Sequence, residues 1–405
     1  MSKFVKLSSV ADLTVGFVGT MAKHYEEEGV PFLRSLNIKP FKIIDDDMKY
    51  VSTEFSNSIS KSILHEGDVV IVRTGIPGTC CVVPAEYDGC NCSDIVIVHP
   101  NIDLVNPHYL AAYINVWGQR QVQNNKVGAI QQHFNVRSAE EMLIFLPDIN
   151  EQERIAEVIV ALNEKIEKNN SICAELEAMA KTLYDYWFTQ FDFPDENGKP
   201  YRTSGGEMVW NDQLKRDIPK GWKVVSITDG YDVCYGFPFD TNYFVDDNSA
   251  QPVVRIRDIL DRSISAYTTE KVDKRYWLQS GDMIIGMDGN FHINFWDNTR
   301  ALLNQRCVRV RSTGKLPVFM AYFASLPYIK AREKNVSRTT VGHLSAGDIK
   351  SLYVFLPDET TLNSAKAIFN VAIEKICRAN DENRELKKLR DWLLPMLMNG
   401  QATVE

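Results

Sequence analysis

Four cysteines lie close together in the first half of the chain, and thiols at short spacing are potential zinc ligands. They are Cys80, Cys81, Cys90 and Cys92. Structural zinc sites usually take their ligands from paired Cys-x-x-Cys arms, and this cluster contains none. We therefore interpret the cysteines as reduced thiols and expect no metal site.

The sequence lacks the usual signatures of an enzyme active site. It contains no Gly-x-x-x-x-Gly-Lys-[Ser/Thr] phosphate loop and no Gly-x-Gly-x-x-Gly cofactor loop. The Asn- or Asp-Pro-Pro-aromatic motif of amino-methyltransferases is missing as well. Pro194-Asp195 is not followed by an Asp/Glu-x-Lys triplet at nuclease spacing. We therefore expect no catalytic residues and no cofactor.

The sequence contains an internal repeat, in which corresponding positions of the two halves lie about 210 residues apart. A Gly-Asp pair precedes an apolar strand in each half, at Gly67-Asp68 and at Gly281-Asp282. Variable offsets early in each half indicate loops of different length on one scaffold. Other matching segments are 32–38 with 253–259, Gly75 with Gly289, His133-Phe134-Asn135 with His343-Leu344-Ser345, and 144–147 with 354–357. The sequence thus predicts two similar globular domains.

Each half ends in a segment whose apolar residues recur at alternating steps of four and three. This spacing is the heptad seam of a coiled coil, and it is narrower than the apolar face of a helix that covers its own domain. The first helix is predicted to start with a capping box at Asn150 and Glu153. Asn169 and Asn383 interrupt the seams, where they would set the register. The predicted seam residues are Ile155, Ile159, Leu162, Ile166, Leu176, Leu183, Phe369, Ile376, Leu386 and Leu393.

Charge is unevenly distributed along the chain, whose formal net charge is −8. Counting charged residues gives −6 for residues 150–199 and +4 for residues 200–350. Phosphate binding requires a local basic surface rather than a basic chain, so this charge permits a nucleic-acid partner without indicating one. No apolar run reaches the length of a membrane span, and the N-terminus lacks the apolar core of a signal peptide. We therefore expect a cytoplasmic protein.

In their order and duplication, these segments resemble the specificity subunits of type I restriction–modification systems. The resemblance spans nearly the whole chain. Its residues in the first half are Phe32-Leu33-Arg34, Gly67-Asp68, Leu146-Pro147 and Glu151-Gln152-Glu153-Arg154-Ile155. Its bridging residues are Trp187-Phe188, Phe191, Pro200-Tyr201 and Ile218-Pro219-Lys220-Gly221-Trp222. None of these short segments is specific to the family by itself. Their order, which occurs twice in one chain, is specific.

The second half departs from this pattern in two places. Its helix begins Asp358-Glu359-Thr360-Thr361-Leu362, without the Glu-Gln pair. Its glycine loop reads Met287-Asp288-Gly289-Asn290, without the arginine that Arg73 supplies in the first half. Base-contact assignments therefore cannot be transferred from one half to the other.

The resemblance implies an α/β (α+β) fold with two target-recognition domains and two long helices that form an antiparallel intramolecular coiled coil. The implied boundaries are 1–149 for the first recognition domain and 150–199 for the first helix and linker. The second recognition domain would span 200–357 and the second helix 358–405.

The resemblance also implies a non-catalytic subunit that binds double-stranded DNA with a bipartite target. Each domain would read one half of the target at a fixed gap, and the helices would act as a spacer. Methylation and cleavage would belong to partner chains, namely two methylation subunits and the restriction (translocase) subunits, which dock on the helices.

Base edges are read by side chains with suitable donors and acceptors, since Arg matches guanine and Asn or Gln matches adenine. Arg34 and Arg255 have a second interpretation, because an arginine in an apolar strand can serve only to pair with a carboxylate. His133 and His343 can likewise be structural. The candidate DNA-binding residues are Arg34, Lys61, Arg73, Thr74, Gln131, Gln132 and His133 in the first half and Arg255, Arg257, Asn290, His292, Arg338, Thr339 and His343 in the second.

The alternative class is a coiled-coil adaptor that holds protein partners without sequence-specific DNA binding. The first helix is acidic and suits a docking surface, with Glu157, Glu164, Glu167, Glu175 and Glu177. Docking is also expected of a specificity subunit, so this feature does not discriminate. Sequence-selective DNA binding that persists at moderate salt would distinguish the two classes, because non-specific binding to phosphates weakens steeply as the salt concentration rises.

Overall fold

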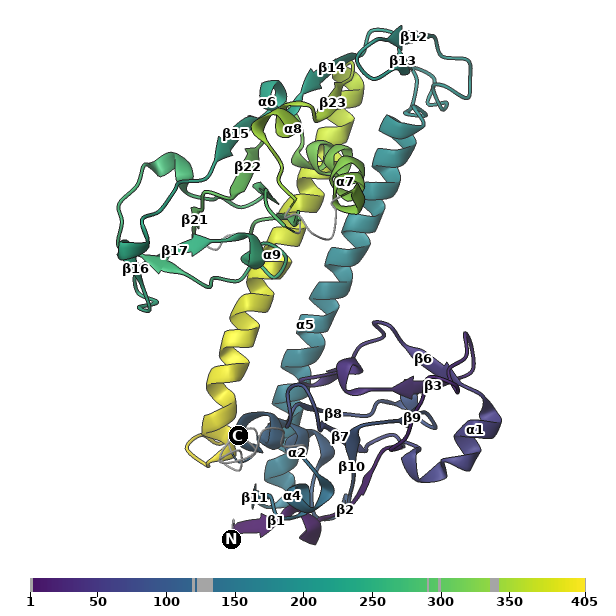
Figure 1. The fold of residues 1–405 in the computed structure, drawn as a ribbon, viewed down its shortest axis with the longest axis vertical. Coiled ribbons are helices and arrows are strands. Elements are labelled where there is room, and N and C mark those ends of the chain that lie inside the picture. Colours follow the sequence, from purple (N-terminus) through teal and green to yellow (C-terminus); the bar gives the residue numbers. More distant parts are fainter. Residues whose placement is uncertain are drawn as a thin grey trace. The chain divides into compact units, whose positions relative to one another are not determined.

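The computed structural model describes residues 3–118, 121, 134–289, 291–297, 300–335 and 342–404. The chain divides into two compact units, each of which is described by itself. Unit 1 comprises Met1–Ile166 and Glu385–Glu405, and unit 2 comprises Glu167–Arg384. Two long helices, α5 (Ile149–Tyr184) and α9 (Glu359–Met398), contribute residues to both units (Figure 1). Over the described residues, none of the helices combines the length and apolarity that a membrane crossing needs.

Unit 1 is built around a four-stranded antiparallel sheet with the strand order β2-β10-β7-β8. Its two central strands are short apolar runs, which is typical of strands buried on both faces. A ribbon pairs β1 with β11, and β3 pairs in parallel with β9. The strands are β1 (Lys3–Lys6), β2 (Ala11–Val15), β3 (Val30–Leu33), β4 (Ile38–Lys39), β5 (Lys42–Ile43), β6 (Lys49–Val51), β7 (Val69–Val72), β8 (Cys80–Val82), β9 (Asn91–Cys92), β10 (Ile95–Pro100) and β11 (Leu143–Leu146), and the shorter helices are α1 (Thr53–Ser58), α2 (Pro107–Tyr113) and α4 (Val136–Glu140).

Unit 2 contains a sheet with the order β15-β22-β19-β20, which matches the order in unit 1 strand for strand. A ribbon pairs β14 with β23, and β17 pairs in parallel with β21. The strands are β12 (Met208–Asn211), β13 (Arg216–Pro219), β14 (Lys223–Ser226), β15 (Asp232–Tyr235), β16 (Phe244–Val245), β17 (Gln251–Val254), β18 (Tyr267–Thr268), β19 (Met283–Gly286), β20 (Ile293–Phe295), β21 (Leu302–Leu303), β22 (Cys307–Arg311) and β23 (Tyr353–Leu356), and the shorter helices are α6 (Ile227–Gly230), α7 (Val318–Asn335) and α8 (Ala346–Lys350).

A glycine after the first sheet strand has the same packing role in both units. Gly16 follows β2, Gly236 follows β15, and each precedes a phenylalanine. A Cβ on Gly236 would lie 1.9 Å from Asn304 O, and one on Gly16 would lie 2.8 Å from Cys92 O. Only glycine fits, because the strand end approaches the backbone of another segment too closely for a side chain. These Gly-Phe pairs are a further match between the two halves.

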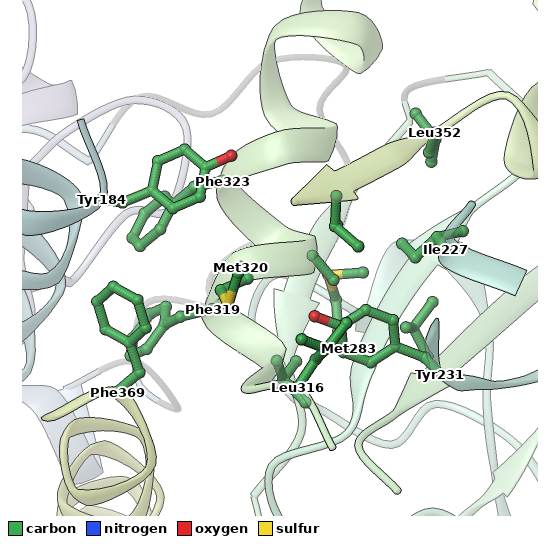
Figure 2. Packing of buried hydrophobic residues seen from close by; sticks show 14 of the residues in the cluster. Tyr184, Ile227, Tyr231, Met283, Leu316, Phe319, Met320, Phe323, Leu352 and Phe369 are labelled. Carbon is green, nitrogen blue, oxygen red and sulfur yellow. The ribbon is translucent and has the colours of Figure 1, made fainter. Parts of the chain in front are cut away.

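The core of unit 2 extends from the sheet to the long helices. Figure 2 shows Phe319 and Phe323 of α7 facing Phe369 of α9 and Tyr184 of α5. The ring centroids are 5.9 Å apart for Phe319 and Phe369, and 5.4 Å apart for Tyr184 and Phe323. Aromatic pairs at such distances add to the free energy gained from apolar burial. The helices of unit 2 are therefore part of its core.

Within unit 2, α5 and α9 pack on each other in opposite directions. Asn169 Nδ2 donates to Asn383 Oδ1 at 2.9 Å, and Asn383 Nδ2 donates to Asn170 Oδ1 at 2.9 Å. One turn further along α5, Cys173 Sγ lies 3.8 Å from Ile376 O, which comes earlier on α9. Asn169 and Asn383 are both buried, so their amides form a polar pair inside an apolar seam.

In unit 1, the first turns of α5 pack against the last turns of α9. Ile155 and Ile159 share a core with Leu397. Arg390 Nη1 donates to Asn163 Oδ1 at 2.9 Å beside this core. The ten predicted seam residues are all buried or half-buried in the unit to which each belongs.

A buried glutamine ties the start of α5 to the sheet domain of unit 1. Gln152 Nε2 donates to Pro147 O at 3.0 Å and to Leu104 O at 3.2 Å, and its Oε1 accepts from Asn106 N at 2.9 Å. The Glu-Gln pair at the helix start therefore has a structural role in this unit. Leu362 takes the equivalent position in α9, where the tie is replaced by apolar packing.

The predicted capping box at Asn150 and Glu153 is wrong. Asp148 caps α5, because its Oδ1 accepts from Glu151 N at 3.1 Å. Helix α5 starts at Ile149, so Asn150 already lies inside its first turn. An ionised carboxylate next to the helix start is a strong acceptor for the free N–H groups there. Asp358 caps α9 in the same way, accepting from Thr361 N at 2.9 Å.

The asparagine pair of unit 2 gives a stability prediction. Replacing Asn169 with leucine removes a donor from the buried Asn383 carbonyl, so the free energy of unfolding should fall by about 1–3 kcal/mol. The double change Asn169→Leu with Asn383→Leu should recover most of this loss, because an apolar pair replaces a polar one. Urea unfolding of the two single variants and of the double variant measures the coupling free energy between the two asparagines. Exposed Asn150→Leu is the control, and three equal unfolding curves would contradict the prediction.

Candidate nucleic-acid interface

A buried aspartate fixes the turn that opens a central strand in each unit. Asp68 Oδ2 accepts from His65 N at 2.8 Å before β7. Asp282 Oδ2 accepts from Gln279 N at 2.7 Å before β19. These carboxylates belong to the two Gly-Asp pairs of the repeat, and they hold the backbone that leads into each strand.

The same aspartates accept hydrogen bonds from a basic side chain on the neighbouring strand. His99 on β10 donates from Nδ1 to Asp68 Oδ1 at 2.6 Å, and this hydrogen bond raises the pKa of His99 above its ordinary value. Arg311 on β22 donates from Nε and Nη2 to the two oxygens of Asp282, both at 2.7 Å. One structural position thus carries histidine in unit 1 and arginine in unit 2. Both side chains link their strand, β10 or β22, to the turn that opens the central strand.

In each unit, the loop after the central strand meets a segment far away in the sequence. Phe134 N donates to Arg73 O at 3.3 Å, and Arg73 Nε donates to Phe134 O at 3.1 Å. In unit 2, Leu344 N donates to Met287 O at 2.7 Å. The fold therefore joins the glycine loop to the segment before α4 or α8, which were separate groups of candidates in the sequence.

An aspartate directly before β10 organises the loop surface of unit 1. Asp94 accepts from Thr74 Oγ1 through its carboxylate and from Ser35 Oγ, at 2.9 Å, through its main-chain oxygen. Arg73 Nη1 lies 3.7 Å from Asp94 Oδ1. The side chain of Asp94 is 43% exposed. Two sequence candidates, Arg73 and Thr74, are thus oriented by an acidic residue at the surface.

Unit 2 has the opposite charge directly before the equivalent strand, β22. Arg306 Nε lies 3.1 Å from Asp288 Oδ2. Asp288 Oδ1 accepts from His343 Nδ1 at 2.5 Å. The side chains of Arg306 and His343 are 55% and 51% exposed. Asp288 follows Met287 as Thr74 follows Arg73, so Asp288 and Thr74 occupy equivalent positions. The residue in the loop is therefore the donor in unit 1 and the acceptor in unit 2.

The strand arginines Arg34 and Arg255 both brace their own loops. Arg34 Nη2 donates to Asp47 Oδ2 at 2.9 Å. Arg255 Nη2 donates to Ser265 Oγ at 2.8 Å, and its Nε lies 4.0 Å from Asp258 Oδ2. These contacts favour the structural interpretation for both arginines.

The remaining candidates are dispersed or lie outside the described residues. Lys61 is exposed, and Arg257 is exposed with its Nε 3.2 Å from Ser265 Oγ. His292 is half-buried, and its main-chain oxygen accepts from Gly286 N at 2.7 Å. The candidates outside the described residues are Gln131, Gln132, His133, Asn290, Arg338 and Thr339.

Sequence reasoning missed Asp94, Asp288 and Arg306. Asp94 and Arg306 immediately precede an apolar strand, and this position is the one signal that could have identified them. Their pairing with residues more than a dozen positions away is a tertiary property. The loops offer hydrogen-bond donors and acceptors at the surface, which is the chemistry of recognition.

The cysteines form no site over the part of the chain that the structure describes. No group of three or more His, Cys, Asp or Glu residues there could hold a metal ion. Burial raises the pKa of Cys90 to about 12, and it raises the pKa of Cys80, Cys81 and Cys92 as well. Thiols with such pKa values are poor nucleophiles and poor metal ligands at neutral pH.

Comparison with known proteins finds a family model that matches the first part of this chain and relatives that are similar to it. Residues 2–178 match the model of the type I restriction modification DNA specificity domain. The type I restriction enzyme EcoBI specificity subunit of Escherichia coli is 29% identical over 193 residues, which are 46% of this chain and 41% of that protein. The MjaIX specificity subunit of Methanocaldococcus jannaschii is 26% identical over 275 residues, 65% of this chain and 62% of that one. Residues 2–178 of this chain therefore resemble a DNA specificity domain, and these two relatives are specificity subunits of type I restriction enzymes.

A solved structure shares the fold of this chain. The crystal structure of the type I restriction–modification S subunit from M. genitalium matches with a TM-score of 0.58 at 13% identity. The match covers 98% of this chain and 96% of that one. The EcoBI and MjaIX specificity subunits are each covered by this chain over less than two thirds of their length. Unit 2 lies largely beyond the residues of the family match, and it carries the same sheet order as unit 1.

The contact between His99 and Asp68 predicts a pH dependence of the stability of this protein. A histidine whose folded pKa is raised stabilises the fold fully below its unfolded value of about 6.5, and this contribution is lost as the pH rises through the folded pKa. The difference in Tm between the native chain and His99→Gln should therefore be larger near pH 6 than near pH 8.

Thermal unfolding of both proteins across this range measures the effect. Asp68→Asn is the second variant, because it removes the partner that raises the pKa of His99. Adding His99→Gln to Asp68→Asn should then produce a Tm change that is nearly independent of pH. A constant Tm difference between the native chain and His99→Gln would contradict the prediction.

Proposed function

We propose that this chain is the DNA-sequence-reading subunit of a type I restriction–modification complex and that each unit reads one half of a bipartite target. The observation that carries the proposal is the DNA specificity domain matched over residues 2–178, together with the same sheet order in unit 2. Because the two units differ in their loop residues, the two half-sites need not be related by symmetry. The chain itself is non-catalytic in this proposal.

The proposed organisation assigns residues 1–149 and 200–357 to the two recognition domains. Residues 150–199 and 358–405 contain the helices, which form an antiparallel coiled coil and set the gap between half-sites. Helices of 36 and 40 residues are about 54–60 Å long at 1.5 Å per residue. Half-sites one DNA turn apart are separated by about 34–36 Å, so this length suits a spacer.

The proposed DNA-reading surface of each unit is the loop that follows the central strand and the segment joined to it. Arg73 and Thr74 are the candidates in unit 1, and His343 is the candidate in unit 2. The hydrogen bonds of Thr74 to Asp94 and of His343 to Asp288, and the ion pair of Arg73 with Asp94, support this assignment, because a reader must be held in one orientation. Exposed Lys61 and Arg257 suit phosphate contacts, which position a protein on DNA without reading sequence.

Methylation and cleavage are proposed to belong to partner subunits that dock on the helices. In unit 2, α5 and α9 form a groove of about 710 Å³ whose lining is mainly apolar. Met179, Ile368 and Val371 line it with exposed fractions of 68%, 45% and 47%. An exposed apolar groove of this kind suits a protein partner.

A second docking face is proposed on α9 in unit 1. Leu389 and Trp392 expose 43% and 61% of their surface there. Leu389 corresponds to Met179 at the same offset that relates the two helices. One apolar face in each unit supports the proposal that two methylation subunits bind.

Mapping modified bases tests the reading function. The chain and its neighbouring methylation subunit would be co-expressed in a methylation-free host, and modified bases would be mapped genome-wide. We expect a split motif with a fixed gap of about 5–8 base pairs, since that gap places the half-sites about one turn apart. A continuous motif would mean that only one unit reads DNA. Absence of methylation from an assembled complex would favour the adaptor function instead.

A charge in the groove of unit 2 tests the docking. Val371→Asp should reduce co-purification of the methylation subunit at least tenfold, because a carboxylate would have to be desolvated in an apolar contact. Asn370→Asp adds the same charge at the adjacent exposed position, which does not line the groove. It should leave co-purification unchanged. Equal co-purification of both variants with the partner would argue against this docking face.

A further inference from the structure

We propose that Arg306 is a base-reading residue of unit 2, that it recognises guanine, and that Asp288 and His343 hold it in its reading orientation. This inference rests on the proposed function and deepens it. It assigns a specificity-determining role to a residue that composition and spacing do not single out.

The three side chains form a connected row at the surface. His343 Nδ1 donates to Asp288 Oδ1 at 2.5 Å, and Asp288 Oδ2 lies 3.1 Å from Arg306 Nε. Asp288 is 26% exposed, whereas Arg306 is 55% exposed. The carboxylate is therefore set back, and the guanidinium extends beyond it. The ion pair at Nε favours an orientation of Arg306 in which Nε faces the carboxylate before any ligand arrives.

The free edge of Arg306 matches guanine. Over the described residues, its Nη1 and Nη2 donate to no protein acceptor, so both terminal nitrogens can face a ligand. Two parallel donors of a guanidinium fit the O6 and N7 acceptors of guanine in the major groove. Ion pairs this exposed contribute little to stability. The stability of the fold therefore does not account for the ordered row, whereas reading a base does.

Other arginines of unit 2, two in β22 and one in a turn, are engaged in contacts within the protein. Arg309 is 2% exposed and pairs with Asp232. Arg311 binds both oxygens of Asp282, and Arg262 Nε donates to Phe295 O at 2.8 Å. Each of these guanidinium groups donates at least one hydrogen bond to a protein acceptor. Arg306 combines high exposure with an anchored orientation.

The comparison between units supports a role in base choice. Both units conserve the scaffold around this position, including the buried turn aspartate and the glycine after the first strand. At the position directly before the strand, unit 1 carries Asp94 and unit 2 carries Arg306. Asp94 presents acceptors, which suit the amino group of cytosine, whereas Arg306 presents donors. Two readers of different half-sites should differ at the positions that contact bases.

The test is a double-mutant cycle between Arg306 and single bases of the DNA. It uses the complete complex and duplex DNA that carries the mapped motif. Arg306→Gln and Arg306→Lys are compared with the native complex in fluorescence binding. One guanine at a time is replaced by adenine in the half-site of unit 2. At one guanine, the replacement should weaken binding of the native complex about fivefold to a hundredfold and weaken binding of both variants less than twofold. The other half-site should keep its full discrimination.

Arg332→Gln is the matched control. Arg332 belongs to the same unit, is 47% exposed and pairs with Asp348 at 3.3 Å, so the change removes an equivalent charge. It should preserve discrimination at every guanine even if overall affinity falls. The inference is overturned if the Arg306 variants keep native discrimination at every guanine of the half-site, or if they lose it uniformly at all positions. Absence of sequence selectivity in the native complex would instead refute the proposed function itself.

Discussion

The fold depends on burying the apolar seams of two helices that are far apart in the sequence. In unit 2, Phe369 of α9 and Tyr184 of α5 complete the aromatic core that includes α7. In unit 1, Ile155 and Leu397 contribute to the same core as the sheet. Apolar burial is the main favourable term in folding, so neither sheet domain is complete without these helix faces. A surface attached to such helices is held rigidly within its unit, as a reading surface requires.

A common scaffold carries different polar groups in the two units. Gly16 and Gly236 permit the same close backbone approach, and a buried aspartate pins the same turn in each unit. Around the loop, however, the charges at equivalent positions are reversed between Asp94 and Arg306. Scaffold positions are constrained by packing and by buried hydrogen bonds, whereas exposed loop positions are not. A duplicated domain can therefore retain its fold while its recognition chemistry diverges.

Many charged side chains in this protein serve the fold. Arg34 and Arg255 brace loops, and Arg309 is almost completely buried against Asp232. A buried guanidinium requires partners because its desolvation is costly, so the surrounding acceptors are committed to it. The arginines suited to a ligand are those anchored by one edge and exposed at the other. This division depends on burial and partner geometry, which a list of arginines does not contain.

The sequence alone determined the repeat, the two heptad seams and the family resemblance, because these are read from periodicity and from the order of short segments. Seam residues such as Ile155 and Ile376 follow from spacing, since a helix repeats its faces at fixed intervals. Only the tertiary structure decided that Asp148 rather than Asn150 caps α5, and that Arg73 meets Phe134. It also decided that Arg306 is anchored while Arg309 is buried. The reason is physical: the pairing and burial of a side chain depend on segments brought together by folding, and local sequence does not encode those contacts.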